Sequence, residues 1–208
     1  FNNGDWFGPI VGLERADSLT LWNYSTLRLP YVVAQRERVL VLQARTGLFA
    51  AQALQHGARR VVVVEPHRSI LSLLMHEYAK QSDSLLLRPA VEVHALEPRS
   101  FLMADTSRFD LIVLPTLDAF GGTSGVYALQ EQYLLTKEAF AEMWERLTPS
   151  GVIAVTSWMD QPVRNPLRVL ATMVAMLADA GVVNPGAHIA AVRSWGTVTF
   201  AVKRTPLT

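Results

Sequence analysis

The chain contains 208 residues, of which half are hydrophobic, and carries a formal net charge of +1. This length fits one domain, the apolar fraction excludes global disorder, and the balanced charge gives no reason to expect a nucleic acid or an anionic membrane as partner. The absence of cysteine excludes disulfides, thiolate catalysis and cysteine-ligated metals. No apolar run reaches the roughly 18–20 residues that span a bilayer, so we expect a cytoplasmic chain without membrane contact of its own.

The first part of the chain differs in character from the rest. Its first residue is Phe1 rather than Met, which predicts a fragment or a processed product. Residues 1–30 show no clear period and are predicted to be a lead-in, a remnant or truncated N-terminal part, that packs on a domain formed by residues 31–208. Apolar runs and helical spacing then predict, in chain order, a strand at 39–42, a helix at 48–55, a strand at 61–64, a helix at 69–80 and a strand at 91–95.

The second half of the chain continues the alternation until its last two strands. The pattern predicts a strand at 111–114, a glycine-rich loop at 121–125, a helix at 131–147, a strand at 152–156, a helix at 167–180, and strands at 188–193 and 197–202. Alternating strands and helices predict a doubly wound α/β fold with a mainly parallel, seven-stranded sheet. Only three residues separate the last two strands, so they must form an antiparallel hairpin. This terminal hairpin is typical of the methyltransferase-like Rossmann fold.

In open α/β sheets, ligands bind outside the carboxyl ends of the strands, at the point where the strand order reverses. Glu65 follows the second predicted strand, about twenty residues after the turn that follows the first strand. An acidic residue in this position can accept hydrogen bonds from a ribose diol. The alternatives are a solvated carboxylate at a strand end and an N-cap for the next helix.

The turn after the first strand, residues 43–47, should approach a nucleotide closely. Nucleotide-binding folds carry glycines in this turn, because backbone N–H groups can then reach the ligand. Here the turn contains Gln43, Arg45 and Gly47, and only Gly47 keeps the glycine. Side chains at Gln43 and Arg45 would crowd a cofactor unless Arg45 points into solvent. A binding turn and a decayed turn are both compatible with this sequence.

Four further side chains are candidates at the other strand ends. Glu97 could contact an adenine or a ribose, or pair with Arg99. Asp118, beside the glycine-rich loop, could bind an amine or accept its proton, or could form a turn. Tyr133 and Trp158 could form an aromatic wall near the pocket, or belong to the core. The five histidines show no paired spacing with a second ligand, so no metal site is expected.

Several segments together resemble the spermidine synthase family, the polyamine aminopropyltransferases, over residues 27–202. The segments that carry this resemblance are 29–31, 38–47, 61–65, Glu97-Pro98-Arg99-Ser100-Phe101-Leu102 (similar to an Asp-Ala-Arg-x-Phe-Leu motif), 109–114, 133–140 and 147–152. The chain is most similar to bacterial spermidine-synthase-like domains, some of which are attached to membrane-spanning segments in a longer protein. The resemblance implies S-adenosylmethionine or its decarboxylated form as the cofactor, a nucleoside-type ligand. It assigns Gln43, Gly47, Glu65 and Glu97 to cofactor binding, Asp118 and Tyr133 to catalysis, and a homodimer as a candidate assembly.

The sequence departs from the family at the residues that carry the reaction. Spermidine synthases have Asp-x-x-Asp after the fourth strand, and the first Asp helps to deprotonate the attacking amine. Pro115 occupies that position here, and only the second acid, Asp118, is kept. Two hypotheses follow. The chain is a transferase that acts on a small amine or another nucleophile, or it is a catalytically inactive domain with a structural or regulatory role.

Overall fold

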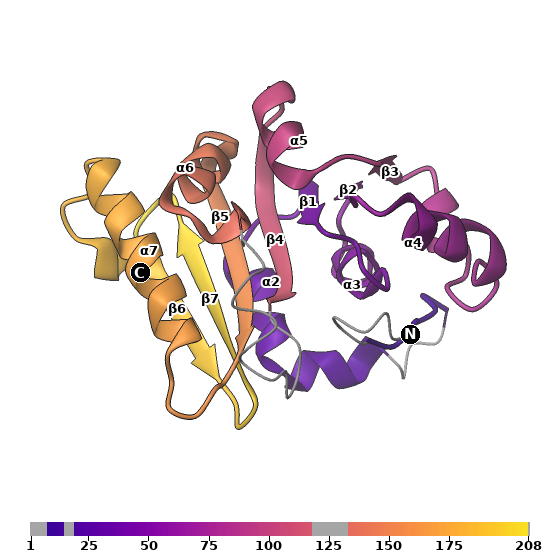
Figure 1. The fold of residues 1–208 in the computed structure, drawn as a ribbon, viewed down its shortest axis with the longest axis horizontal. Helices are drawn as coiled ribbons and strands as arrows, with labels where there is room; N and C mark the ends of the chain where they lie inside the picture. The colour runs from indigo at the N-terminus through magenta and orange to yellow at the C-terminus, as the bar shows by residue number, and fades with distance from the viewer. Residues whose placement is uncertain (1–7, 15–18, 118–132, 208) are drawn as a thin grey trace.

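The computed structural model describes residues 8–14, 19–117 and 133–207, and places a single seven-stranded sheet at the centre of the molecule (Figure 1). The strand order is β3-β2-β1-β4-β5-β7-β6, and only β7 runs antiparallel to its neighbours. The strands are β1 (Arg38–Leu42), β2 (Arg60–Val64), β3 (Val91–His94), β4 (Phe109–Leu117), β5 (Leu147–Trp158), β6 (Ile189–Arg193) and β7 (Thr197–Lys203). The predicted fold class is therefore confirmed.

The central strands form where the sequence offers unbroken β-branched and aliphatic runs. In β2, the residues from Val61 to Val64 are fully buried, and the same holds for the residues from Val39 to Leu42 in β1. Strands covered on both faces need apolar side chains at every position, which explains why these runs do not alternate. In the sheet, β1 and β2 pair in register from Arg38 with Arg60 to Leu42 with Val64.

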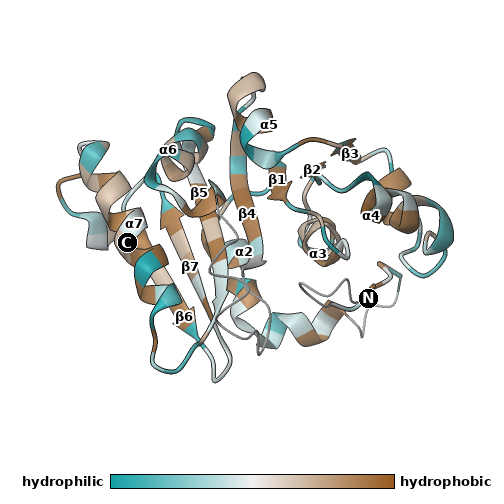
Figure 2. Ribbon diagram, viewed as in Figure 1, coloured by the Kyte–Doolittle hydropathy of each residue, from teal (hydrophilic) through white to brown (hydrophobic). Residues whose placement is uncertain are grey.

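Helices cover both faces of the sheet, and each layer encloses its own apolar cluster. One face packs against α2, α3 and α4 with residues of the lead-in, and the other against α5, α6 and α7. The brown, apolar strands of Figure 2 lie between these two layers. The helices are α2 (Leu29–Val33), α3 (Leu48–Gln55), α4 (Arg68–Ser72), α5 (Pro98–Ala104), α6 (Lys137–Glu145) and α7 (Asn165–Asp179). Short single turns are η1 (Leu21–Tyr24), η2 (Thr26–Arg28), η3 (Leu73–Glu77), η4 (Leu85–Leu87), η6 (Tyr133–Leu135) and η7 (Pro185–His188).

Two predicted helices are shorter than the spacing of apolar residues indicates. The helix predicted at 69–80 is α4 followed by the π-helical turn η3, which ends at Glu77. The described part of the helix predicted at 131–147 begins only at Lys137. There Thr136 has an extended backbone, and its hydroxyl accepts a hydrogen bond from the Ala139 N–H. Leu147 already belongs to β5 rather than to the helix.

The C-terminal hairpin has the predicted form. Strand β7 pairs antiparallel with both β5 and β6. The connection between β6 and β7 is closed by the Ser194 N–H, which donates to the Thr197 carbonyl at 2.8 Å. So short a connection cannot cross over the sheet, and the last strand must therefore reverse direction.

The described residues of the lead-in pack on the face covered by α2, α3 and α4. Val11, Leu19 and Leu27 are buried in that cluster. The ring of Tyr31, in α2, stacks on the His56 ring at a centroid distance of 4.4 Å. Among the described residues, no helix combines the length and the apolar character that a membrane span requires. The division of the chain at residue 30 stays a prediction.

Candidate nucleoside site

The strand order reverses between β1 and β4, and the carboxyl ends of β1, β2 and β4 meet beside this switch point. The chain leaves β1 toward β2 and β3, and it returns to place β4 on the other side of β1. Pairing of β4 with β1 extends only to Val113, whereas β4 continues beside β5 as far as Leu117. Strand β1 ends at Leu42, so β4 extends beyond it at the carboxyl edge of the sheet, which is where ligands bind in this class of sheet.

The turn after β1 has the backbone shape of a glycine turn, although only one glycine is left in it. Gln43 has a φ of 66°, Arg45 a φ of 51° and Gly47 a φ of 82°, so all three adopt the left-handed conformation. Glycine reaches this region freely, whereas side chains such as Gln and Arg enter it at a cost of about 1–3 kcal/mol each. The Gly47 N–H donates to the Ala44 carbonyl at 2.8 Å, and α3 begins directly after the turn.

Glu65 holds this turn in place. It follows β2 directly, is only 2% exposed, and its two carboxylate oxygens accept different backbone hydrogen bonds. Its Oε2 accepts from the Arg45 N–H at 3.1 Å, and its Oε1 from the His67 N–H at 3.0 Å. His67 is the N-cap residue of α4. Glu65 therefore links the turn after β1 to the start of α4. The two alternatives, an N-cap and a solvated carboxylate, are wrong, because His67 is the N-cap and Glu65 is buried.

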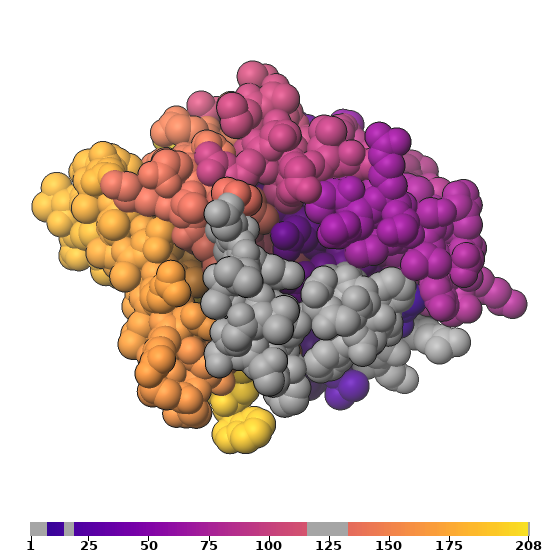
Figure 3. All heavy atoms as spheres, in the orientation of Figure 1, coloured from indigo at the N-terminus to yellow at the C-terminus, as the bar shows by residue number. Residues whose placement is uncertain are grey.

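The turn is covered as well as held. Thr46 is 5% exposed and Ala44 1% exposed. A Cβ at Gly47 would lie 2.8 Å from Leu85 Cδ2, so a side chain at this position would push the Leu85 side chain of η4 aside. On the side of the molecule seen in Figure 3, the atoms of α4 and α5 lie at the surface. Ala44, Thr46 and Gly47 are thus buried, whereas Gln43 and Arg45 are only partly buried.

Glu97 lies between β3 and α5, directly before the helix, and its environment differs from that of Glu65. It is exposed and occupies the N-cap position of α5, but its carboxylate makes no capping hydrogen bond. The alternative partner, Arg99, instead forms an ion pair with Glu142 of α6. Glu97 is thus a solvent-facing carboxylate near the sheet edge, and its role toward a ligand stays a prediction.

The acceptor side of the switch point lies at the end of β4. Pro115 is buried within β4, at a register shift against β5 between Leu114 and Leu117. A proline cannot donate to a sheet ladder, and it is tolerated here because pairing with β1 has already ended. Asp118, the predicted catalytic acid, lies outside the described residues. Tyr133 is 60% exposed on η6.

Tyr133 and Trp158 were the two candidates for an aromatic wall or for the core. Tyr133 does not belong to the core, because its side chain is exposed. Trp158 ends β5 and lies against the hairpin connection, where a Cβ at Gly196 would be 3.7 Å from its ring. The role of both residues in catalysis or in lining a pocket stays a prediction.

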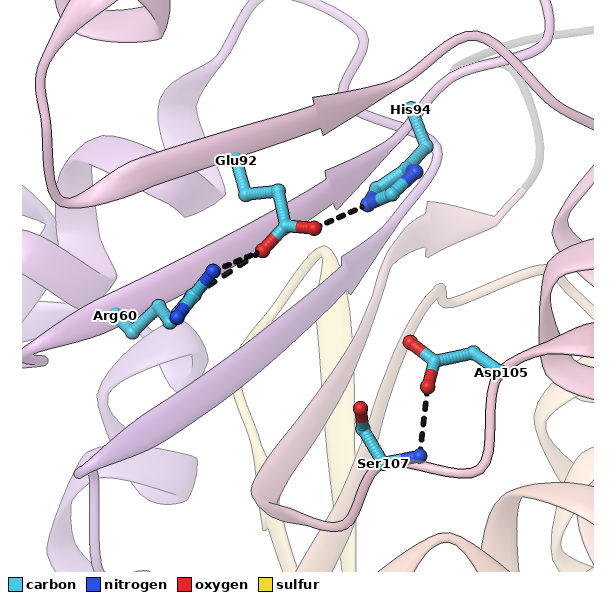
Figure 4. Close-up of polar contacts among 5 residues, drawn as sticks. All are labelled: Arg60, Glu92, His94, Asp105 and Ser107. Carbon is cyan, nitrogen blue, oxygen red and sulfur yellow. Dashed lines mark hydrogen bonds and ion pairs between the residues drawn. The ribbon is translucent and has the colours of Figure 1, made fainter.

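Charged side chains of β2 and β3 pair with one another (Figure 4). Arg60 and His94 both contact the Glu92 carboxylate, at 2.7 and 2.8 Å, and the hydrogen bond from Arg60 is the main reason that the pKa of Glu92 lies below its usual range. For Asp105, burial raises the pKa, but hydrogen bonds from Ser107 outweigh it and lower the pKa overall. Charged groups at an edge strand such as β3 discourage pairing with another sheet, which accounts for this cluster without a ligand.

Sequence reasoning missed two features of the site. It left open whether the turn with Gln43 and Arg45 is a binding turn or a decayed one, and it did not predict that both residues adopt the left-handed conformation. It also missed Asp83, whose carboxylate accepts a hydrogen bond from the Glu14 N–H across 69 positions of sequence. The Asp83-Ser84 pair is a turn signal in the sequence, but it carries no indication of a distant partner. Within the described ranges, no three His, Asp or Glu side chains gather as a metal site would require.

Comparison with known proteins finds similarity to aminopropyltransferases and to methyltransferases. Polyamine aminopropyltransferase 2 of Pseudomonas aeruginosa is 26% identical over 151 residues, which is 71% of this chain and 41% of that enzyme. A spermidine synthase solved with the transition-state analogue AdoDATO has a TM-score of 0.62 at 16% identity, over 86% of this chain and 58% of that one. Ribosomal protein L11 methylase of Lactobacillus delbrueckii subsp. bulgaricus has a TM-score of 0.57 at 16% identity, over 98% of this chain and 83% of that one.

The chain is a spermidine synthase-like protein with a methyltransferase fold. No protein-family model matches it. The spermidine synthase-like chain spans about two fifths of the curated aminopropyltransferase and less than two thirds of the spermidine synthase structures. Similarity at these identities establishes the fold, and the activity of the longer enzymes does not follow from it.

Proposed function

We propose that this domain binds the nucleoside part of S-adenosylmethionine, or of its decarboxylated form, at the carboxyl ends of β1 and β2. The bound sulfonium compound would donate a carbon group to a small amine or to another nucleophile. The observation that carries the proposal is the turn from Gln43 to Gly47. It keeps a left-handed backbone at three positions and is tied to the acid that follows β2.

Strain of this kind needs a reason. Two non-glycine residues in left-handed conformation within three positions cost free energy that an ordinary strand-to-helix connection avoids. Strained backbone is concentrated at ligand-binding and catalytic sites, where the surrounding structure holds it in place. Glu65 supplies this constraint, because it accepts the Arg45 N–H from a buried position. The turn therefore has the properties of a binding element.

The residues present are compatible with a ribose. A carboxylate offers about four lone-pair sites, and the two backbone hydrogen bonds to Glu65 leave acceptor capacity on each oxygen. Glu65 and the Gln43–Gly47 turn would hold the nucleoside, and Glu97 lies at the end of the next strand, where it could add a contact. AdoDATO bound to the spermidine synthase of the same fold is a ligand of this class.

The acceptor would not be activated as in a polyamine synthase that has two acids after β4. Pro115 offers neither an ionisable group nor a backbone N–H. In this proposal Asp118 is the one acid that binds the acceptor and Tyr133 is the second catalytic side chain, so a single carboxylate would have to both hold an amine and take its proton. The proposal therefore favours a nucleophile that needs less help with deprotonation than a protonated diamine. A cytoplasmic location and a homodimer stay predictions.

One observation favours a second candidate function, a catalytically inactive domain. Glu65 is 2% exposed, and both its oxygens already accept backbone hydrogen bonds. A carboxylate whose partners are all within the chain stabilises the fold without any ligand. In that case the turn would be a retained structural feature of an ancestral site.

Calorimetric titration with S-adenosylmethionine, its decarboxylated form and methylthioadenosine separates the two candidates. The transferase proposal predicts saturable binding that Glu65→Gln weakens by roughly 1–3 kcal/mol, because a ribose hydroxyl loses its charged acceptor. Glu37→Gln is the matched control, since Glu37 is an exposed partner of Arg59 that precedes β1. No heat with any of the three compounds would leave the inactive domain as the better description. Equal affinity in both variants would move the ribose site elsewhere.

A further inference from the structure

The lead-in lies against two turns beside the proposed nucleoside site. The Glu14 N–H donates to Asp83 Oδ2 at 2.9 Å, and the Glu14 carboxylate lies 3.7 Å from Arg88. Val11 is buried, and Ile10 packs against the same apolar cluster. Figure 1 shows this indigo segment beside the loop that follows α4. Residues 8–14 are called the strap below.

The strap also contacts the turn after β1. A Cβ at Gly8 would lie 3.2 Å from Thr46 Cγ2 and 3.3 Å from Thr46 Oγ1, so the backbone of the strap at Gly8 rests directly on that side chain. Thr46 is 5% exposed. Leu85 packs on Gly47 from η4, next to the turn that contains Asp83. One connected set of contacts thus runs from Glu14 through the Asp83 turn to Gly47.

The anchor of the strap is built from a strained turn and close-fitting glycine. Asp83 and Ser84 both have left-handed backbones, with φ of 51° and 53°. A Cβ at Gly12 would lie 2.3 Å from Asp83 Oδ2, so a side chain at this position would push the carboxylate away from the Glu14 N–H. The polar contacts of the anchor are weak, since the hydrogen bond is exposed and the Glu14 carboxylate is 80% exposed.

We propose that the strap is an autoinhibitory element that competes with the ligand for the Gln43–Gly47 turn. This inference rests on the nucleoside-binding function proposed above. A ligand that approaches the backbone of this turn must displace Gly8 from Thr46, and the weak anchor at Asp83 allows that release. Apparent affinity then equals the intrinsic affinity scaled by the fraction of molecules with the strap released. Loosening the strap raises this fraction and tightens binding.

Two variants release the anchor by different means, and a third variant serves as the control. Gly12→Ala displaces the Asp83 carboxylate, whereas Asp83→Gly removes it while accepting the left-handed backbone without strain. Gly186→Ala is the matched control, because its Cβ would be at an ordinary 3.5 Å from the nearest atom, Asn184 Oδ1. Each protein is titrated with methylthioadenosine by calorimetry. Exchange of the Glu14 amide hydrogen is followed by NMR with and without this compound.

We expect Gly12→Ala and Asp83→Gly to bind methylthioadenosine about two- to fivefold more tightly than the wild type and Gly186→Ala, because the exposed contacts that hold the strap are weak. We also expect the compound to accelerate exchange at Glu14 in the wild type, because linkage between ligand and strap is reciprocal. Unchanged affinity in both variants would overturn the strap inference and leave the nucleoside site standing. Weaker binding, or slower exchange at Glu14 with ligand, would show a strap that closes over the ligand and would also overturn it. Absence of binding in all four proteins would refute the proposed function, and the inference with it.

Discussion

The two sides of the switch point differ in how much of the proposed transferase site they carry. At the carboxyl ends of β1 and β2, the left-handed turn and the acid that braces it are both present. At the carboxyl end of β4, Pro115 occupies the position where the resemblance leads us to expect the first acid of a pair. The proposed cofactor side therefore has a backbone shape that costs free energy to maintain, whereas the proposed acceptor side has Pro115 where the resemblance leads us to expect an acid.

If the proposed site is correct, this difference implies that its two halves can change independently. The turn after β1 depends on backbone conformation, which neighbouring residues can hold even when glycine is replaced. Proton transfer depends on one side chain with the right chemistry, and no neighbour substitutes for it. A protein with this combination can bind a nucleoside and still fail to run the original reaction.

The largest expected effect is on aminopropyl transfer. With decarboxylated S-adenosylmethionine and putrescine, we expect a rate lower by about 10²–10⁴-fold than that of an enzyme with both acids, because Pro115 cannot act as a base. Spermidine and methylthioadenosine would be quantified over time. Pro115→Asp should raise the rate, and Pro115→Ala, which removes the ring without adding a carboxylate, should not. Enzymes typically turn over about 10 substrate molecules per second. Turnover of the unaltered protein at about this rate would refute this account of the acceptor side.

The next effect concerns the brace of the turn. Glu65→Ala should lower the free energy of unfolding by about 1–3 kcal/mol, because the Arg45 N–H would lose its acceptor inside the domain. Chemical denaturation monitored by circular dichroism measures this change. Glu37→Ala removes an exposed carboxylate of equal charge and should change stability by less than about 0.5 kcal/mol. Equal midpoints for the two variants would mean that Glu65 does not hold the turn.

A smaller effect tests the strain in the turn with one substitution at two places. Gln43→Gly relaxes a residue with a φ of 66° and should leave stability unchanged or raise it. Gln55→Gly places the same change at the end of α3 and should lower stability by roughly 0.5 kcal/mol, since glycine is costly in a helix. Thermal unfolding of both variants gives the comparison. A larger loss in Gln43→Gly than in Gln55→Gly would show that the Gln43 side chain supports the turn.

The smallest effect is a pH dependence on the face that carries the lead-in. Burial lowers the pKa of His56, and Arg28 and Arg36 lower it further. The unfolded chain, with a His pKa of about 6.5, therefore binds a proton more readily than the folded one, so stability falls as the pH drops below about 6.5. His56→Phe keeps a ring against Tyr31 and should flatten this decline, measured as unfolding midpoints from about pH 8 to pH 5. His76→Phe, at an exposed position, should follow the wild type.

Most of the fold could be predicted because its signals are local. Four valines in a row specify a strand buried on both faces, and a three-residue connection specifies an antiparallel hairpin. The start of α6 could not be read from apolar spacing, because the hydroxyl of Thr136 caps the helix there. The extent of β5 depends on pairing with β4, a partner 38 positions away at the pair of Phe109 with Leu147.

The candidate site was predictable in position but not in conformation. The strand ends and Glu65 follow from the order of elements. The left-handed backbone at Gln43 and Arg45 does not, because these residue types do not favour it and the carboxylate that holds Arg45 is twenty positions away. The contact of Glu14 with Asp83 is more distant still. Both features depend on tertiary contacts that have no signal in a local pattern.

The central claim is that a nucleoside binds where Glu65 braces the turn, and an NMR titration with methylthioadenosine tests it most directly. Two amides report on the site, Arg45 and His67, because both donate to the Glu65 carboxylate. The Arg38 amide, which donates to Asp110 at the opposite end of β1, is the internal control. We predict saturable shifts of the Arg45 and His67 amides with the Arg38 amide unmoved. Amide shifts that map to other strands would contradict the claim. The absence of any shift up to the solubility limit of methylthioadenosine would contradict it as well.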